Sequence, residues 1–345
     1  MNIKKFFAAV VVMVLGVYAV HAAWTNPQAK QLLGNLSESR LLAAIGVSVG
    51  TGSESAALPE GTDGETGLSQ PEDSLPPFPS EVEIPEAEEP QPSEAQIVLP
   101  TTIEGGMVIT NNTSFELDLG ALVSAGTSVK LAKDSPQILI IHTHGSEAYT
   151  PDDTDSYDYT DNFRTEDPNY SVIRVGDELA SCLESYGLNV IHDKNIYDYP
   201  SYTGSYGRSE EAVKEYLAQY PTISVVLDVH RDAIGDGDVV YKTIAEAGGK
   251  PCSQVMMLVG TGENGLAHPN WQENLKFALY LQSAVVKRYP SLCRPIALKK
   301  ERYNQHLSTG YLILEVGSSG NTLDEALNAV RLFADAAAPA LLKLS

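Results

Sequence analysis

Three short apolar runs of the chain are each followed by residues that can bind a metal or transfer protons. A short apolar run between polar segments is typical of a strand buried on both faces of a sheet. In open α/β sheets, the chemistry lies just beyond the carboxyl ends of the strands. The runs span 138–141, 223–229 and 311–314, and the residues that follow them are His142, His144, Glu147, His230 and Glu315.

Between these runs, apolar residues recur at helical spacing. Val172, Val175 and Leu179 share one face of a helix that is expected to extend from Ser171 to Gly187. The alternation of helices with strands predicts an α/β fold, with a mostly parallel central sheet flanked by helices. Further helices are expected over 209–219, after Trp271 and over 323–342, the last interrupted by Pro339, and further strands over 188–191, 255–259 and 296–298.

Residues 1–24 have the pattern of a cytoplasmic stub and a transmembrane anchor. Two lysines precede an apolar stretch, 6–20, that is about long enough to cross a bilayer. A cleaved signal peptide is the alternative, because 20–23 resembles a cleavage site. Trp24 is an interfacial type of residue and favours the uncleaved anchor. Both interpretations place the rest of the chain outside the cytoplasm.

Residues 25–100 are expected to form an extracytoplasmic linker that is largely disordered. The segment from Gly50 to Pro100 is rich in Pro, Glu, Ser and Gly. Such a segment buries too little apolar surface to offset the conformational entropy lost on folding. A folded domain is expected over 101–345, beginning with an edge hairpin at 106–110 and 115–119.

The charge of the chain excludes one class of partner. The formal net charge is −22, from 45 acidic and 23 basic residues. Nucleic-acid binding requires a basic surface, so we expect no nucleic-acid partner. Much of the acidity lies in the linker, and it therefore says little about other partners.

The residues after the three strands form a ligand set for catalytic zinc. If the strands are parallel neighbours, these side chains converge on one edge of the sheet. Two His, one Glu and an open position are typical of catalytic zinc, with a further Glu near the metal-bound water. We assign His230 and Glu147 as ligands. Glu315 follows a fully apolar strand and is assigned as the general base that later donates its proton.

His142 and His144 compete for the remaining ligand position. Residues two apart on a strand face the same way, but a turn after the strand would separate them. One of the two should bind the metal while the other forms hydrogen bonds around the site. We favour His142 slightly, with His144 as its substitute. The other histidines in this region, His192, His268 and His306, are expected at the surface or in the cleft and not as ligands.

Five segments, in order along the chain, resemble the stage II sporulation protein P family. They are 142–147, 164–170, 228–234, 268–271 and 314–322. The resemblance covers roughly 100–345, together with the plan of anchor and linker. That family is similar to the zinc-dependent N-acetylmuramoyl-L-alanine amidases of the cell wall. The resemblance implies an α/β amidase fold and hydrolysis of the amide between N-acetylmuramic acid and L-Ala in peptidoglycan, and it leaves endopeptidase activity open.

The resemblance also implies partners and residue roles. It implies septal wall thinning and engulfment during sporulation, alongside stage II sporulation protein D, a lytic transglycosylase, and the membrane protein stage II sporulation protein M. His230 matches the second ligand His, and Glu315 matches the catalytic Glu. The broader amidases take their ligand Glu from just before the next helix. Asp167-Pro-Asn-Tyr170 occupies that region here, so Glu147 or Glu166 must serve.

We therefore expect a single-pass, membrane-anchored zinc amidase whose catalytic domain is extracytoplasmic. One alternative is a zinc endopeptidase or carboxypeptidase that acts on the stem peptide alone. Another is a non-catalytic scaffold that binds wall material. Glu315 argues mildly against the scaffold, because a scaffold does not need an acid at the end of an apolar strand.

Overall fold

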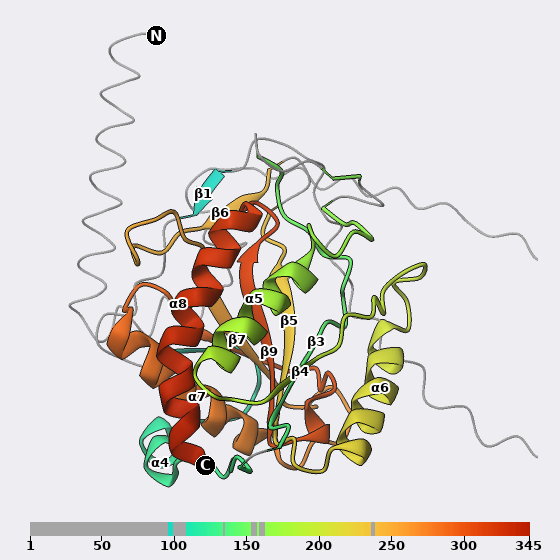
Figure 1. Ribbon diagram of the computed structural model, residues 1–345. Coiled ribbons are helices and arrows are strands. Elements are labelled where there is room, and N and C mark those ends of the chain that lie inside the picture. Colours follow the sequence, from blue (N-terminus) through green and yellow to red (C-terminus); the bar gives the residue numbers. More distant parts are fainter. Residues whose placement is uncertain (1–95, 99–107, 134, 153–156, 159–162, 236–238) are drawn as a thin grey trace, which may run out of the picture. The chain divides into compact units, whose positions relative to one another are not determined.

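Seven strands of the described residues form one central sheet (Figure 1). The computed structural model describes residues 96–98, 108–133, 135–152, 157–158, 163–235 and 239–345. From edge to edge the strands are β2 (Ile109–Asn111), β8 (Ile296–Lys299), β7 (Val255–Gly260), β9 (Gly310–Ser318), β5 (Val225–Asp232), β3 (Ile138–Ile141) and β4 (Val190–His192). A separate two-stranded sheet pairs β1 (Gln96–Val98) with β6 (Tyr241–Thr243).

The strands of the central sheet run in two directions. β9, β5, β3 and β4 are mutually parallel, which confirms that the three strands of the expected site are parallel neighbours. β2, β8 and β7 are also parallel to one another. The two groups meet at the antiparallel pair of β7 and β9. The fold is therefore mixed α/β, with a central sheet flanked by helices.

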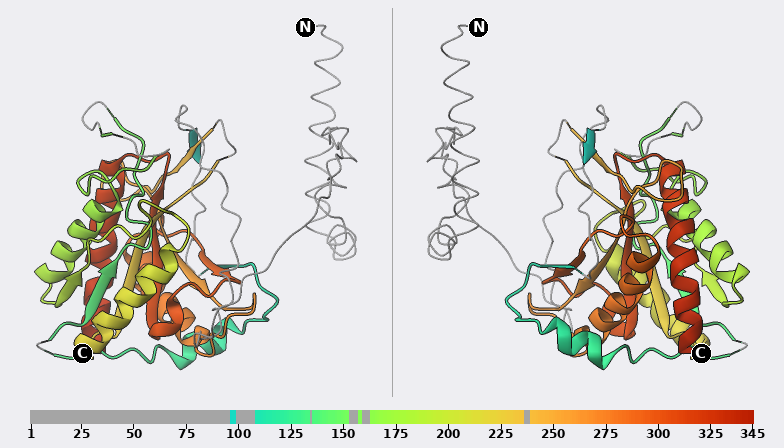
Figure 2. Two further views of the ribbon diagram at one scale, coloured as in Figure 1. Left: turned by 90° about the vertical axis from the view of Figure 1, so that its right-hand side faces the viewer. Right: turned by 90° about the vertical axis from the view of Figure 1, so that its left-hand side faces the viewer.

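The side chains of each strand alternate between two differently covered faces. On one face, Leu227, Val229 and Leu314 belong to the main hydrophobic core. This face packs against α5 (Val172–Ser185), α7 (Trp271–Arg288) and α8 (Leu323–Leu341). In the left-hand view of Figure 2, α5 and α8 lie to the left of the strands. The opposite face packs against α6 (Ser205–Gln219), where Val226 and Tyr311 contact Val213 in a smaller core.

Two of the helices around this sheet, α5 and α8, begin at residues whose side chains cap them. Ser171 precedes α5, and its side chain accepts a hydrogen bond from the amide of Ile173. Thr322 and Glu325 form a reciprocal capping box at the start of α8. Each cap satisfies backbone donors that would otherwise lack an intrahelical partner. α5 is thus fixed on the face of the sheet opposite α6.

Two sequence-based expectations about elements are wrong. The expected edge hairpin is absent from the described residues, where β2 pairs in parallel with β8 and is followed by α4 (Leu119–Ala125). Asp118 caps α4 by accepting from the amide of Ala121, which favours helix over strand at this point. Pro339 does not interrupt α8 but lies within its last turn. A 3₁₀ turn, η2 (Leu342–Leu344), follows directly.

The expected anchor and nearly all of the expected linker, residues 1–95, lie outside the described residues. Among the helices that are described, none is both long and apolar enough to cross a membrane.

Candidate active site

His230 on β5 lies directly opposite Glu315 on β9 in the paired strands. Both side chains alternate onto the face of the sheet that α6 covers, together with Asp228 and Ile313. Tyr206, near the start of α6, and Tyr303 approach the same place. A cavity of about 170 Å³ opens here, and it is lined by His144, Glu147, Tyr206, His230, Arg231, Asp232, Ala233, Leu258, Tyr303, Ile313 and Glu315.

His230 is held between two carboxylates. Its Nε2 lies 2.9 Å from Oδ1 of Asp228, and its Nδ1 lies 3.4 Å from Oε2 of Glu147. Asp228 is itself fixed by the backbone amide and hydroxyl of Thr143 and by the hydroxyl of Tyr311. Burial alone would lower the pKa of His230, but the two carboxylates outweigh it and raise that pKa well above its ordinary value. A metal that binds this ring must therefore displace a proton.

Glu147 lies in the turn after β3 and points at the same ring. Its Oε2 also accepts the backbone N–H of Arg231 at 3.1 Å, and its Oε1 lies 3.8 Å from the guanidinium of Arg164. Burial by itself raises the pKa of Glu147. The neighbouring His230 outweighs that effect, and the pKa falls below its ordinary value. Glu147 is consequently a carboxylate at neutral pH.

His144 completes the group of nitrogen and oxygen donors. Its ring lies edge-on to that of His230, with 5.2 Å between the ring centroids. Its Nε2 is 2.7 Å from the hydroxyl of Tyr202, and its buried Nδ1 has no hydrogen-bond partner. Burial lowers the pKa of His144 to about 3. The ring is therefore neutral at pH 7, which is the form that binds metals.

Glu315 is half-buried beside these residues. Burial, followed by the nearby Asp232 carboxylate, raises the pKa of Glu315 to about 8, although His230 opposes the shift. One of its oxygens, Oε2, is buried without a hydrogen-bond partner. A carboxyl with such a pKa exchanges protons near neutral pH, as a general acid–base group must.

His142, the slightly favoured ligand of the sequence analysis, lies away from this cavity. It continues the alternation of Ile138 and Ile140, so it faces α5 and not α6. Its Nδ1 is 2.9 Å from the carbonyl oxygen of Val229, and its Nε2 is 2.8 Å from Nε2 of His192. Both nitrogens of His142 are thus already engaged, one by a backbone carbonyl and one by a second histidine. The geometry favours His144, not His142, as the partner of Glu147 and His230.

The remaining expected residues also lie apart from the cavity. Glu166 is exposed and does not line it. His268 and His306 do not line it either, and their ring centroids lie 6.5 Å apart.

The donor set fits zinc by its chemistry. His144, Glu147 and His230 are ligand types of catalytic zinc sites, and Glu315 supplies the additional carboxyl. The partnerless Nδ1 of His144 is a buried donor atom of the kind that a metal would satisfy. As the described side chains stand, no three His, Cys, Asp or Glu groups are arranged to hold a metal ion. His230 and Glu147 contact each other instead.

Among the residues that sequence reasoning missed, two contact the histidines of the site directly. Asp228 could have been found, because it precedes His230 by two positions on a strand and must share its face. Tyr202 lies in the loop before α6, 58 residues after His144, and no pattern in the sequence connects the two.

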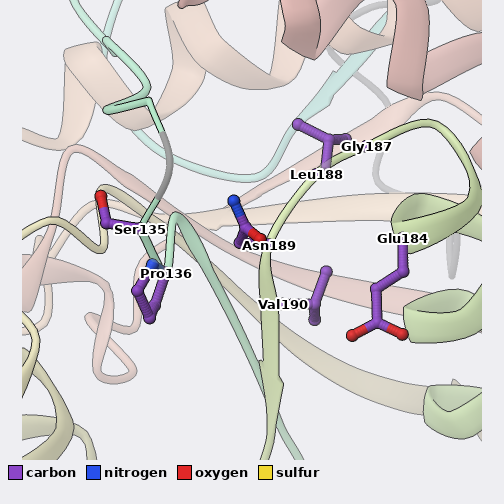
Figure 3. A pocket seen from close by; sticks show the side chains of 7 residues that line it. All are labelled: Ser135, Pro136, Glu184, Gly187, Leu188, Asn189 and Val190. Atoms are coloured by element: carbon purple, nitrogen blue, oxygen red, sulfur yellow. The ribbon is translucent and has the colours of Figure 1, made fainter.

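A larger cavity of about 470 Å³ lies at the opposite end of the strands, where β3 and β4 begin. Figure 3 shows its lining, which comprises Ser135, Pro136, Glu184, Gly187, Leu188, Asn189 and Val190. Glu184 is the sole titratable side chain of that lining, and no histidine belongs to it. Despite its size, this cavity therefore lacks the donors that would hold a metal ion and the second carboxyl that would transfer a proton beside it.

Solved structures to which this chain is similar include several N-acetylmuramoyl-L-alanine amidases. The N-acetylmuramoyl-L-alanine amidase AmiC2 of Nostoc punctiforme is 13% identical, with a TM-score of 0.33, over 60% of this chain and 96% of that one. An N-acetylmuramoyl-L-alanine amidase of Clostridium difficile 630 is 13% identical, with a TM-score of 0.35, over 61% and 97%. Ami1 of Mycobacterium abscessus is 12% identical, with a TM-score of 0.36, over 61% and 99%. These similarities are too distant to carry an inference about chemistry.

Comparison with protein families gives a closer relationship. Stage II sporulation protein P of Bacillus subtilis (strain 168) is 31% identical over 216 residues, which are 59% of this chain and 50% of the relative. The chain thus spans about half the length of this curated relative. The family model of stage II sporulation protein P (SpoIIP) matches residues 66–338. Because that match covers most of the chain, the protein belongs to the stage II sporulation protein P family.

Proposed function

We propose that this protein is a zinc-dependent peptidoglycan hydrolase of sporulation, which cleaves the amide between N-acetylmuramic acid and L-Ala of the stem peptide. One observation carries the proposal: His144, Glu147, His230 and Glu315 line a single cavity, although they come from three separate strand ends. Membership of the stage II sporulation protein P family supports the choice of substrate and process.

In this proposal, His144, Glu147 and His230 hold the zinc ion. When bound, zinc supplies a Lewis acid that polarises the amide carbonyl and makes water a better nucleophile. Asp228 accepts a hydrogen bond from Nε2–H of His230, which would leave Nδ1 for the metal. Arg164 and the backbone amide of Arg231 hold the Glu147 carboxylate in place.

Glu315 carries the proton through the reaction. It takes one proton from the attacking water, whose oxygen forms a bond to the carbonyl carbon of the lactyl group. The bond between that carbon and the L-Ala nitrogen then breaks, and Glu315 gives the proton to the departing amine. The products are a carboxylic acid on the muramic acid and a peptide with a free amino terminus. The raised pKa of Glu315 suits both steps.

The cellular location of the reaction, the process it serves and its partners are part of the same proposal. The apolar stretch at 6–20 would anchor the chain in the membrane, and the acidic linker would let the hydrolase reach the wall from an extracytoplasmic position. Septal wall thinning and engulfment are the proposed process. Stage II sporulation proteins D and M are the proposed partners.

The test measures zinc content and product release with the full-length protein and purified peptidoglycan. The wild type should carry about one zinc ion, and His230→Ala should lose it. Glu315→Gln should keep zinc but lose activity by about 100-fold or more, because a general acid–base group is removed. His306→Ala, which lies outside the cavity, serves as the control and should match the wild type.

Mass spectrometry of the products separates the proposal from its alternatives. Amidase cleavage releases stem peptides with L-Ala at the amino terminus, whereas an endopeptidase or carboxypeptidase leaves peptide attached to muramic acid. A wild type that binds no zinc and releases nothing, even with added zinc and the partner proteins, would instead support a wall-binding scaffold.

A further inference from the structure

The two histidines of the proposed zinc site are held in the same way. In each ring Nε2 is engaged, by Asp228 in the case of His230 and by the hydroxyl of Tyr202 in the case of His144. In each ring Nδ1 is left for other contacts. Nδ1 of His230 faces Glu147, and Nδ1 of His144 is buried with no hydrogen-bond partner. Tyr202 thus contacts Nε2 of His144 in the same way as Asp228 contacts Nε2 of His230.

Tyr202 makes more than a single contact with His144. The two rings stack with their centroids 4.4 Å apart and an interplanar angle of 19°. The guanidinium of Arg164 lies over the Tyr202 ring, 5.2 Å from its centroid. Arg164 is itself held by Asp198, at 2.6 Å, and lies near the Glu147 carboxylate. The orientation of His144 is therefore set by a stack of three side chains.

Asp198 is the other candidate to orient His144, and its geometry is unsuitable. Its Oδ2 lies 3.9 Å from Nδ1 of His144, which is too far for a hydrogen bond. Its oxygens already accept from the amide and hydroxyl of Ser146 and from Arg164. Asp198 therefore holds Arg164 and the turn after β3, and the contact with Tyr202 fixes the His144 ring.

We propose that Tyr202 is a positioning residue for His144, and that it fixes the neutral tautomer in which Nε2–H donates to the Tyr202 hydroxyl and Nδ1 keeps its lone pair for the metal. The inference rests on the proposed zinc site. Outer partners of metal-bound histidines typically contribute about 10–100-fold to metal affinity. Tyr202 contributes through the orientation of His144 and not through contact with the substrate.

The first test measures zinc affinity by competition with a chromophoric chelator, using the full-length protein. Tyr202→Phe removes the hydroxyl and keeps the ring, and it should weaken zinc binding by about 10–100-fold. Tyr202 is 37% exposed, so the variant should fold, and its Tm without zinc measures what is lost when Nε2 of the buried His144 has no partner. Tyr199→Phe is the matched control, because Tyr199 lies in the same loop, is 44% exposed, and should retain wild-type affinity.

The two possible failures are distinguishable. Equal zinc affinity in Tyr202→Phe and the wild type would overturn the inference while leaving the proposed zinc site intact. Tighter binding in Tyr202→Phe would also overturn it, because the hydroxyl would then be competing with the metal for Nε2. A wild type that binds no zinc would overturn the proposed function and this inference together.

A second measurement needs no metal. Long-range ¹H–¹⁵N NMR of the zinc-free protein should show the proton of His144 on Nε2 in the wild type. In Tyr202→Phe the Nε2–H population should fall. A proton found on Nδ1 in the wild type would contradict the inference, whatever the zinc affinities are.

Discussion

At the scale of single residues, the choice between His142 and His144 shows what alternation along a strand can decide. His142 follows Ile138 and Ile140 in the even-numbered series, which faces α5. His230 and Glu315 lie on the opposite face of the sheet. The period of two along the strands therefore already shows that His142 does not lie beside them. His144 lies beside His230 and Glu315 because the chain turns after β3. No sequence pattern specified the direction of that turn.

Alanine variants of His144 and His142 should show which of the two histidines binds zinc and which only stabilises the fold. His144→Ala should abolish zinc binding. His142→Ala should keep about one zinc ion but lower the free energy of unfolding by about 1–3 kcal/mol, because the carbonyl of Val229 and the ring of His192 lose a buried partner. Zinc content and urea unfolding measure the two effects. Loss of zinc from a folded His142→Ala protein would reverse the assignment.

At the scale of elements, the apolar runs located the strands and helices well. β3 has the predicted bounds, and α5 and α7 begin where they were expected. The errors lie where a local signal was weak. A capping Asp118 turned an expected strand into the start of α4. Pro339 is tolerated because it lies in the last turn of α8, where the one hydrogen bond that it cannot donate and the bend that its ring imposes affect only the end of the helix.

The packing of α5 against the buried histidine pair allows a prediction at this scale. A Cβ at Gly176 would lie 2.5 Å from Nε2 of His192 and 2.6 Å from Nε2 of His142. Gly176→Ala should therefore destabilise the protein by about 1–3 kcal/mol through overpacking, despite the better helix propensity of alanine. Urea unfolding of the variant measures this cost.

Gly207 in α6 is the matched control for this substitution. A Cβ there would have no other atom within 4 Å. Gly207→Ala should stabilise the protein by about 0.4–1 kcal/mol, because alanine reduces the entropy of the unfolded chain without meeting a neighbour. If both variants changed stability by the same amount and in the same direction, packing on the histidine pair would not be the cause.

At the scale of the whole molecule, the class of fold followed from the alternation of elements, but the order of the strands did not. Local periodicity predicts that strands such as β7 and β9 exist, and it carries no information about which strand lies beside which. The antiparallel pairing of β7 with β9 joins strands that are separated along the chain by α7 and β8. The convergence of three strand ends, by contrast, was predictable, since each ended in a residue suited to the same site.

The change in the free energy of unfolding with pH depends on all the titratable groups of the molecule. His268 makes one contribution that can be tested separately. Burial, then His306 and Arg302, lower the pKa of His268 to about 4. The ordinary pKa of histidine is about 6.5, so between about pH 6.5 and 4 the unfolded chain binds a proton at this position that the folded chain does not. The contribution of His268 to the free energy of unfolding is therefore fully present above about pH 6.5, and it decreases as the pH falls toward 4.

Replacement of His268 by leucine should remove this acid-sensitive contribution. Both ring nitrogens of His268 are buried without hydrogen-bond partners, so an apolar side chain of similar size leaves no partner unsatisfied. The difference in unfolding free energy between His268→Leu and the wild type should shift in favour of the variant as the pH falls from 7 to 4.5. Comparing the two proteins at each pH cancels the contributions of Glu315 and of the histidines that do not interact with His268. A difference that stays constant across this range would show that His268 titrates alike in the folded and unfolded chains.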